Sequence, residues 1–278
     1  MPKLEEKLAL KAKLRGNSLA ELVLKAYGLL FARKIFIKFN KLLYLCSLRG
    51  LGALECGKGE VRFLEEYFKN CPGGVVFDVG ANEGNYSRDV LTVNSEAIIY
   101  AFEPHPSTFK RLKKNLNSEN FHAVNVAVGD VETVLSLYDY KNSDGSSHAS
   151  LFKNVIENIH ESEAIEHKVK MISLGSFITS NGIDQIALLK IDVEGNELNV
   201  LKGVTDQIAL GKISAIHFEF NEMNVLSRVF FRDFWNLLPN YDFYRLVSDG
   251  MIKIENYSPV FCEIFGYQNI IAILKKAN

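Results

Sequence analysis

The sequence predicts an α/β protein in which a mostly parallel β-sheet, covered by helices on both faces, follows a basic helical arm. From residue 75 onward, short apolar β-branched runs alternate with segments of helical periodicity, as in βαβ units. Carboxylates and glycines stand directly after several of these runs, where open parallel sheets bind their ligands. Before residue 57, apolar residues recur at helical spacing with many bases between them.

Composition favours one domain with an extension. The chain has 278 residues, 47% hydrophobic and 23% charged, as is usual for globular proteins. We predict an arm over residues 1–56 and one folded domain over residues 57–278. The formal net charge of −1 gives no sign of a nucleic-acid partner, and we expect none. Four cysteines lie far apart without CxxC spacing or a His cluster, so we expect a reducing cytosol and neither a disulfide framework nor a zinc site.

The arm is predicted to form two helices between Leu4 and Leu48, with a break at the Gly-Asn-Ser of residues 16–18. Residues 1–50 contain eleven Lys or Arg and three Glu, an excess of eight positive charges. Two interpretations stay open: a helical cap with a solvated basic face, or an arm that contacts an anionic membrane surface or a partner protein. We find no run of 18 uncharged apolar residues and no signal peptide. We therefore expect a cytoplasmic protein, peripheral at the inner membrane surface if the arm binds lipid.

The elements of the body follow from the apolar runs and from the Gly and Pro residues between them. A helix over residues 60–69 ends near Cys71–Gly74, where Pro and two Gly interrupt it. Further helices are expected after the strands that begin at residues 75, 97, 168, 186 and 213. The predicted strands are, in order, 75–80, 97–103, 121–129, 133–140, 168–173, 186–195, 213–220, the YDFYRLV run and 269–274.

Conspicuous polar residues fall at the carboxyl ends of these strands. A carboxylate at one such place would be ordinary, but carboxylates at five strand ends outline a cleft along one edge of the sheet. The residues at the strand ends are Asp78, Gly80, Asn82, Gly84, Glu103, Gly129, Asp130, Asp192, Glu194, Gly195 and Glu219.

The stretch FDVGANEGNYS, residues 77–87, closes the first of these strands. Gly80 and Gly84 permit positive φ angles and let the backbone approach a ligand closely. A dinucleotide fingerprint would read GxGxxG, whereas this turn lacks the first close glycine pair and carries Asp78 and Glu83, which would repel a phosphate. The turn therefore favours a cationic or neutral ligand, with a tight turn for packing alone as the alternative.

Glu103 lies 25 positions beyond Asp78, at the tip of the second strand. A carboxylate there accepts two strong hydrogen bonds from a ribose diol, which NAD and S-adenosylmethionine both contain. S-adenosylmethionine fits better, because it has adenosine and a sulfonium but no phosphate. The alternative is a salt bridge from Glu103 to Lys110 or Arg111.

Four motifs in order, DVGANEGNYS, AFEPHP, NVAVGD and LLKIDVEGNELNVLKG, resemble those of the FkbM-type methyltransferases, which use S-adenosylmethionine. The similarity runs from about residue 60 to residue 203 and leaves the arm outside. It implies a Rossmann-like seven-stranded methyltransferase sheet, mostly parallel with the last strand antiparallel. It also implies O-methylation, in pathways that often make surface polysaccharides or natural products.

The resemblance further implies roles for the residues at the strand ends. Glu103 would hold the ribose, and Asp130 would face the adenine amino group, with a turn-capping role for Asp130 as the alternative. The methionine end of the cofactor would be framed by Asp78, Gly80, Asn82 and Gly84.

Methyl transfer requires that acceptor, carbon and sulfur lie in line, and a hydroxyl acceptor also needs a base. Asp192 and Glu194 are the candidate catalytic residues, because they end the strand beside the expected methyl position and residues i and i+2 of an extended segment face one side. Two alternatives stay open: Glu194 caps the next helix, or both carboxylates hold a divalent metal. His217, inside an apolar strand, is expected to be a core histidine.

The longest polar loop, residues 140–154, follows a strand near the predicted cleft, and loops beside a rigid cleft often recognise acceptors. Ser146, Ser147 and His148 are the candidate substrate-binding residues, with a solvated loop without a binding role as the alternative. The sequence thus predicts an S-adenosylmethionine-dependent methyltransferase that O-methylates a sugar, a glycan or another hydroxylated small molecule. The competing hypotheses are an NAD-dependent oxidoreductase and a non-catalytic scaffold that keeps the cofactor fold and docks to a membrane or partner.

Overall fold

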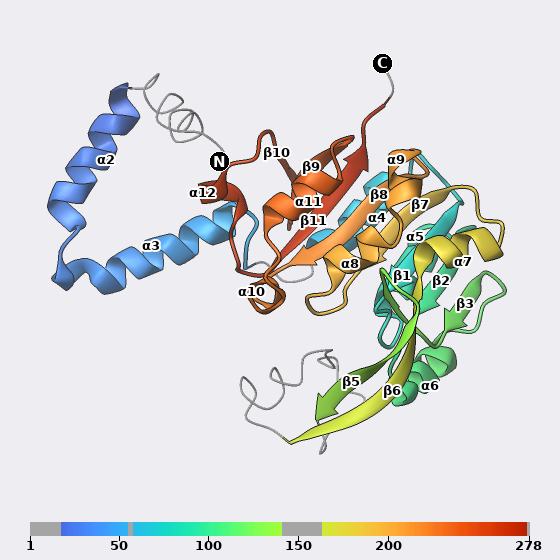
Figure 1. Cartoon of the computed structure of the whole chain (residues 1–278). Helices are drawn as coiled ribbons and strands as arrows, with labels where there is room; N and C mark the ends of the chain where they lie inside the picture. The colour runs from blue at the N-terminus through green and yellow to red at the C-terminus, as the bar shows by residue number, and fades with distance from the viewer. Residues whose placement is uncertain (1–17, 55–57, 141–162, 277–278) are drawn as a thin grey trace.

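The structure is a computed structural model that describes residues 18–54, 58–140 and 163–276. A large central sheet carries helices on both faces, a small second sheet adjoins it, and two helices of the arm project to one side (Figure 1). The α/β architecture with an N-terminal helical arm is therefore confirmed for the part of the chain described.

The central sheet has eight strands in the order β10-β9-β11-β8-β7-β1-β2-β3. The pairs β1–β2, β1–β7, β2–β3 and β7–β8 are parallel, whereas β11 runs antiparallel to both β8 and β9. The strands of this sheet are β1 (Val75–Val79), β2 (Ile98–Phe102), β3 (Phe121–Val124), β7 (Ile186–Ile191), β8 (Ile213–Phe220), β9 (Tyr241–Val247), β10 (Gly250–Ile254) and β11 (Gln268–Leu274).

The antiparallel last strand is confirmed, but the count of seven strands is one too low. β10 folds back on β9 as an antiparallel hairpin at the edge of the sheet. Its residues are mostly half-buried or exposed. Its sequence GMIKI therefore does not show the regular alternation of apolar and polar residues that predicts a strand with one buried face.

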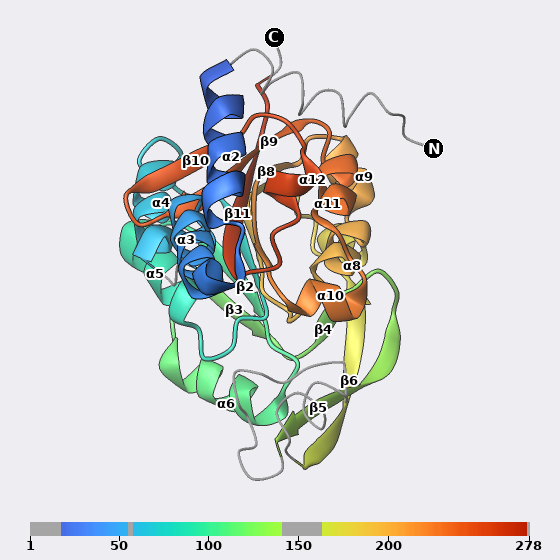
Figure 2. The same cartoon turned by 90° about the vertical axis from the view of Figure 1, so that its left-hand side faces the viewer.

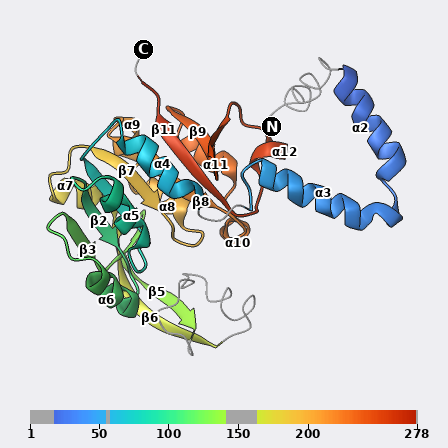
Figure 3. The same cartoon turned by 180° about the vertical axis from the view of Figure 1, so that it is seen from behind.

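Helices cover the two faces of the sheet and enclose two apolar cores. Figure 1 shows α7, α8, α9 and α11 in front of the sheet, and Figure 3 shows α4, α5 and α6 on the opposite side. The first core joins residues of α7, α8, α9 and α11 to the strands, and the second joins residues of α4, α5 and α6 to them. The helices of the body are α4 (Lys58–Phe68), α5 (Asn85–Val93), α6 (Pro106–Asn115), α7 (Leu174–Ser180), α8 (Glu197–Lys202), α9 (Thr205–Ala209), α10 (Met223–Ser227), α11 (Phe231–Leu237) and α12 (Pro259–Cys262).

The predicted strand over residues 121–129 is in fact two strands in different sheets. β3 pairs with β2, whereas β4 (Ala127–Gly129) pairs with β6 (Ala164–Ser173), which in turn pairs with β5 (Thr133–Tyr140) in a three-stranded sheet. The chain turns at Asn125, whose side-chain amide donates to the carbonyl oxygens of Glu103 at 2.8 Å and Pro104 at 3.1 Å. This turn redirects the strand away from the central sheet.

The predicted strand over residues 186–195 was too long, because regular pairing ends at Ile191. Glu194 has φ 52° and Gly195 has φ 98°, so both are in the left-handed region and the segment after β7 is a turn. The argument that Asp192 and Glu194 face one side of an extended segment was therefore wrong, and their positions are set by this turn instead.

The arm consists of α2 (Ser18–Phe31), the short 3₁₀ helix η1 (Lys34–Phe36) and α3 (Ile37–Gly50). The bend at residues 32–36 was not predicted, because no Gly or Pro marks it. No helix within the described residues is long and apolar enough to cross a membrane. The division into an arm over 1–56 and a domain over 57–278 stays a prediction, since residues 55–57 lie outside the described part of the chain.

Candidate active site

A cavity of about 270 Å³ lies at the carboxyl ends of β1, β2, β7 and β8. This volume is close to the lower end of the range for small-molecule pockets, about 300–1,000 Å³. It lies at the edge of the sheet where the sequence predicted a cleft. Its walls are formed by Val79, Gly80, Asn82, Phe102, Glu103, Pro104, Thr108, Val126, Ala127, Val128, Leu137, Asp192, Val193, Glu194, Asn196, Glu219 and Tyr267.

The two ends of this cavity differ in chemistry. One wall is apolar and includes Pro104, Val126 and Leu137, while the part formed at the carboxyl ends of β7 and β8 carries Asp192, Glu194 and Glu219. Glu103 belongs to the wall formed at the end of β2. Among the described residues that line it, none is Lys or Arg. The cavity therefore suits a ligand with an apolar part and a cationic part, and it offers no side-chain cation to a phosphate.

Gly80 brings the turn after β1 against the turn after β7. Its φ is 80°, and a Cβ atom at this position would lie 1.7 Å from the carbonyl oxygen of Asp192. The two segments are also joined directly, because the backbone N–H of Asp192 donates to the carbonyl of Val79 at 2.9 Å. Only glycine combines this backbone conformation with so close an approach.

Glu103 at the tip of β2 is held by backbone amides and not by a basic side chain. The N–H of Asn82 donates to its Oε2 at 2.9 Å, and the N–H of His105 donates to its Oε1 at 2.8 Å. Arg111, one of the two salt-bridge partners considered from the sequence, donates to Glu83 at 2.7 Å. Burial raises the pKa of Glu103 to about 7, although the two backbone hydrogen bonds act in the opposite direction.

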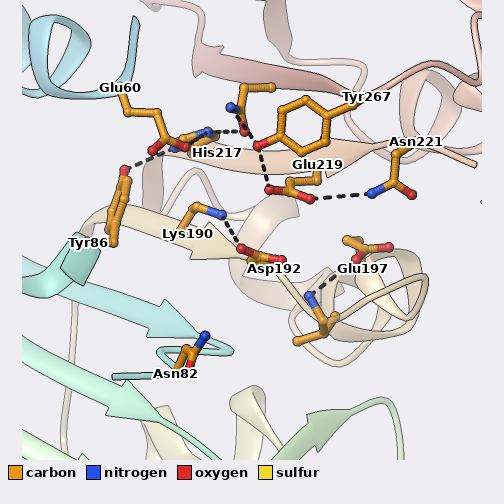
Figure 4. Close-up of polar contacts among 12 residues, drawn as sticks. Glu60, Asn82, Tyr86, Lys190, Asp192, Glu197, His217, Glu219, Asn221 and Tyr267 are labelled. Carbon is orange, nitrogen blue, oxygen red and sulfur yellow. Dashed lines mark hydrogen bonds and ion pairs between the residues drawn. The ribbon is translucent and has the colours of Figure 1, made fainter. Parts of the chain in front are cut away.

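Lys190 and Asp192 form an ion pair beside the acidic end of the cavity (Figure 4). Lys190 Nζ lies 3.4 Å from Asp192 Oδ2, and the ammonium is buried on the sheet face that α4 and α5 cover. Burial alone would lower the pKa of Lys190, but the surrounding carboxylates of Asp192, Glu219, Glu60 and Asp78 raise it above its usual value. The structure thus places a permanent cation behind Asp192.

The turn between β7 and α8 is organised by Glu197. Its Oε1 accepts from the backbone N–H of Gly195 at 3.0 Å and from that of Val193 at 3.2 Å. α8 begins at Glu197 itself, with Asn196 as its N-cap residue. Glu197 therefore fixes the backbone that carries Glu194 into the cavity wall.

The carboxylate of Glu219 is held by two polar side chains (Figure 4). The hydroxyl of Tyr267 donates to Oε1 of Glu219 at 2.9 Å, and the side-chain amide of Asn221 donates to Oε2 at 3.3 Å. His217, two residues earlier in β8, is fully buried and has partners at both ring nitrogens. These are the hydroxyl of Tyr86 at 3.0 Å and Oδ1 of Asn269 at 3.0 Å.

Several carboxyl groups around this end have pKa values above the usual range. Burial, with the neighbouring charges of Asp192 and Glu219, raises the pKa of Glu194 to about 8. Burial likewise raises the pKa values of Glu197 and Glu219 to about 7. The stability that these protonated groups contribute is fully present below about pH 4.5 and is lost as pH rises through 7 to 8. A bound cation would favour the ionised forms and offset this loss.

The structure places the predicted site residues in three groups. Gly80, Asn82, Glu103, Asp192 and Glu194 all line the cavity. Asp78 and Gly84 lie behind the wall. The Asp78 carboxylate accepts from the hydroxyl of Ser87 at 2.6 Å, and Gly84 packs against Leu112 and Leu116. Asp130 is exposed and is not part of the cavity wall. Ser146, Ser147 and His148 lie outside the described residues.

Several residues near the site were not singled out from the sequence, among them Lys190, Tyr267 and Leu137. Lys190 and Tyr267 were missed altogether, and Leu137 was seen only as part of an additional strand. A lysine within the apolar run IALLKI was the available signal for Lys190. In the described part of the chain, no three His, Cys, Asp or Glu side chains are arranged to hold a metal ion.

Comparisons with known proteins find a family and several relatives of similar sequence. A family model described as the methyltransferase FkbM domain matches residues 78–244. The hexuronic acid methyltransferase AglP of Haloferax volcanii is 32% identical over 136 residues, which cover 48% of this chain and 51% of that protein. The 31-O-demethyl-FK506 methyltransferase FkbM of Streptomyces tacrolimicus is 29% identical over 191 residues, covering 56% of this chain and 74% of that protein.

A solved structure, that of the methyltransferase FkbM from Methylobacillus flagellatus KT, is 13% identical to this chain with a TM-score of 0.45. The similarity covers 72% of this chain and 43% of that one. Among the curated relatives, the matches span 59% of the length of methyltransferase 1 of Beauveria bassiana and 51% of AglP. The chain thus corresponds to little more than half of these two relatives.

Proposed function

Because this chain belongs to the FkbM methyltransferase family, we propose that it is an S-adenosylmethionine-dependent methyltransferase that O-methylates a sugar, a glycan or another hydroxylated small molecule. One observation carries the proposal. The cavity offers an apolar wall, a carboxylate at the tip of β2 and an acidic end, and none of its described lining residues is Lys or Arg. The acceptor class rests on the names of two relatives, a hexuronic acid methyltransferase and a 31-O-demethyl-FK506 methyltransferase.

The residues of the cavity fit such a cofactor. The apolar side chains of Pro104, Val126 and Leu137 would contact the adenine ring, and Glu103 would accept hydrogen bonds from the ribose hydroxyls. The backbone at Gly80, which lines the cavity, would approach the methionine part. NAD fits less well, since its two phosphates would meet carboxylates and no lysine or arginine of the described wall.

When bound, S-adenosylmethionine supplies a methyl group that its sulfonium makes electrophilic. The chain itself must align the acceptor and remove the proton of its hydroxyl group. We propose that Asp192 is the base that accepts this proton, since it lines the cavity beside the ammonium of Lys190. Glu194, with a pKa of about 8, holds its own proton at neutral pH in the absence of a ligand and is less suited to accept another.

The experiment that tests the proposed function measures transfer of a labelled methyl group from S-adenosylmethionine to a panel of acceptors. The panel should contain hexuronic acids, neutral sugars and hydroxylated macrolides, with amines and thiols as controls. Label that appears on a hydroxyl, and is resistant to mild base as an ether would be, supports O-methylation. Label on amines only would contradict it, and binding of cofactor without transfer to any acceptor would favour the non-catalytic scaffold.

A first prediction concerns the ribose carboxylate. Glu103→Gln should weaken binding of S-adenosylhomocysteine by about 10- to 150-fold, because a lost charge-assisted hydrogen bond is worth roughly 1.5–3 kcal/mol. The matched control is Glu83→Gln, the same change one residue after Asn82, at a side chain that pairs with Arg111 outside the cavity wall. Calorimetric titration of both variants provides the comparison. Equal affinity of Glu103→Gln and wild type, at unchanged melting temperature, would remove Glu103 from the site.

A second prediction concerns the number of protons released when the cofactor binds. The positive sulfonium beside Glu194 should lower its pKa from about 8, so S-adenosylmethionine should release more protons on binding than S-adenosylhomocysteine, which lacks this charge. Calorimetry near pH 7.5, in two buffers of different ionisation enthalpy, measures the difference. In Glu194→Gln the difference between the two ligands should shrink. If the difference is unchanged in this variant, the sulfonium does not lie beside Glu194.

A further inference from the structure

The arm exposes large apolar side chains that no described residue covers. Among the side chains described in α2 and α3, only Leu48 is buried. Leu22 is 63% exposed, Leu29 76% and Leu30 58%, which are unusual values for three leucines in one helix. Contiguous apolar surface of this kind marks an interaction site.

Four exposed apolar residues of α2 form a stripe along one side of the helix. Leu19, Leu22, Val23 and Leu30 follow the spacing i, i+3, i+4 and i+11, so they share one face. Lys25 lies on the other side. In Figure 2, α2 and α3 are seen as a pair that stands in front of the body. The stripe is therefore the face of an amphipathic helix without a protein neighbour among the described residues.

The bend between α2 and α3 is held by specific contacts. The side-chain amide of Asn40 donates to the carbonyl of Phe31 at 3.0 Å, and the hydroxyl of Tyr27 donates to Oδ1 of Asn40. The ring of Phe31 also contacts those of Phe36 and Phe39, at centroid distances of 5.1 and 5.8 Å. These contacts fix α2 relative to α3, so the two helices present their side chains as one unit.

The charge of this unit is strongly positive. Over residues 18–50 there is a single acidic residue, Glu21, against six basic residues. All six basic side chains are exposed: Lys25, Arg33, Lys34, Lys38, Lys41 and Arg49. Basic residues beside an exposed apolar stripe complement a surface that is both anionic and apolar beneath.

We propose that the arm docks on an anionic lipid surface, with the leucine stripe of α2 inserted among the headgroups and the basic residues near the lipid phosphates. Charge favours lipid over a second copy, because two arms in contact would bring their cations together. The root of the arm also adjoins the active-site cavity, since the N–H of Leu54 donates to the carbonyl of Tyr267 at 2.7 Å. Docking would therefore hold the cavity near the lipid surface. The proposal is independent of the proposed activity.

Flotation of the full chain with vesicles tests this docking, and it separates binding from aggregation because only lipid-bound protein rises. Vesicles of phosphatidylcholine alone are compared with vesicles that also contain phosphatidylglycerol. The chain should float with the anionic vesicles and progressively less as salt is added, because each Lys or Arg near the surface contributes about 1 kcal/mol at low salt, or roughly fivefold in affinity. Equal flotation with both vesicle types would overturn the role of charge.

Two variants with the same change in net charge test the stripe. Leu22→Glu combined with Leu30→Glu places both carboxylates on the stripe, whereas Leu24→Glu combined with Gly28→Glu places them on the other side of α2. At Gly28 a Cβ atom would have nothing within 4 Å, so the control introduces no clash. The stripe variant should bind anionic vesicles at least about tenfold more weakly than the control, because it loses the two leucines that would insert among the headgroups.

Equal weakening by the two variants would show that the stripe is not the contact and would overturn the proposal. If the full chain does not float with any vesicle, the arm binds a protein or a second copy instead, and the proposal is equally overturned. All variants should bind S-adenosylhomocysteine with unchanged affinity. This measurement verifies that the body of each variant remains folded.

Discussion

Gly80→Ala should abolish measurable cofactor binding and destabilise the fold by about 3–5 kcal/mol, the largest structural effect that we expect from a single methyl group. An alanine at φ 80° is strained by roughly 1–2 kcal/mol, and its Cβ would lie 1.7 Å from the carbonyl oxygen of Asp192. The turn after β1 and the turn after β7 must then move apart. Both carry residues of the cavity wall, so the site should be lost with the contact.

Thermal unfolding and titration with S-adenosylhomocysteine measure this effect against a matched control. Gly182 also has a positive φ, 62°, but a Cβ atom there would meet nothing within 4 Å. Gly182→Ala should therefore show only the backbone strain of about 1–2 kcal/mol and keep its affinity for the ligand. If Gly80→Ala binds the ligand with wild-type affinity, the close approach of the two turns does not shape the site.

Asp192→Asn should keep cofactor affinity and lose turnover by about 10²- to 10⁴-fold, the range that a general base supplies. The carboxylate lines the cavity and stands in front of the buried ammonium of Lys190, so an amide at this position could neither take a proton nor pair with the cation. Single-turnover methyl transfer to an acceptor identified in the panel measures the chemical step alone.

Three controls identify the cause of such a loss. Asp184→Asn makes the same chemical change at an exposed ion pair with Lys212 and should leave turnover unchanged. A metal role would be revealed by a chelator that abolishes wild-type activity, restored by added Mg²⁺ or Ca²⁺. A purely structural role would lower the melting temperature and cofactor affinity together. Turnover of Asp192→Asn within about threefold of wild type would exclude Asp192 as the base.

The parallel core of the fold could be predicted because its central strands β1, β7 and β8 are almost entirely buried. VVFDV and IALLKI are apolar β-branched runs bounded by turn residues, and they became β1 and β7. The hairpin strand β10 could not be predicted in this way, because most of its residues are partly or fully exposed at the sheet edge. The division between β3 and β4 depends on pairing with distant strands and on Asn125, neither of which local periodicity reports.

The site residues could be predicted where their position at the end of a strand places them in the cavity wall. Glu103 and Asp192 follow β2 and β7, the two parallel strands on either side of β1, so they meet at one edge of the sheet and both line the cavity. Tyr267 reaches the same cavity from the segment before β11. It could not be predicted, because local sequence does not show that β11 pairs antiparallel with β8. Asp130 follows β4 in the second sheet and is exposed outside the cavity wall. Its position therefore does not support the predicted contact with adenine.

Calorimetric titration of the full chain with S-adenosylhomocysteine and, separately, with NADH tests most directly whether the cavity binds an S-adenosyl cofactor. We expect saturable binding of one S-adenosylhomocysteine per chain and no binding of NADH, because the described wall offers a ribose carboxylate and an acidic end but no lysine or arginine for phosphates. Saturable binding of NADH without binding of S-adenosylhomocysteine would contradict it.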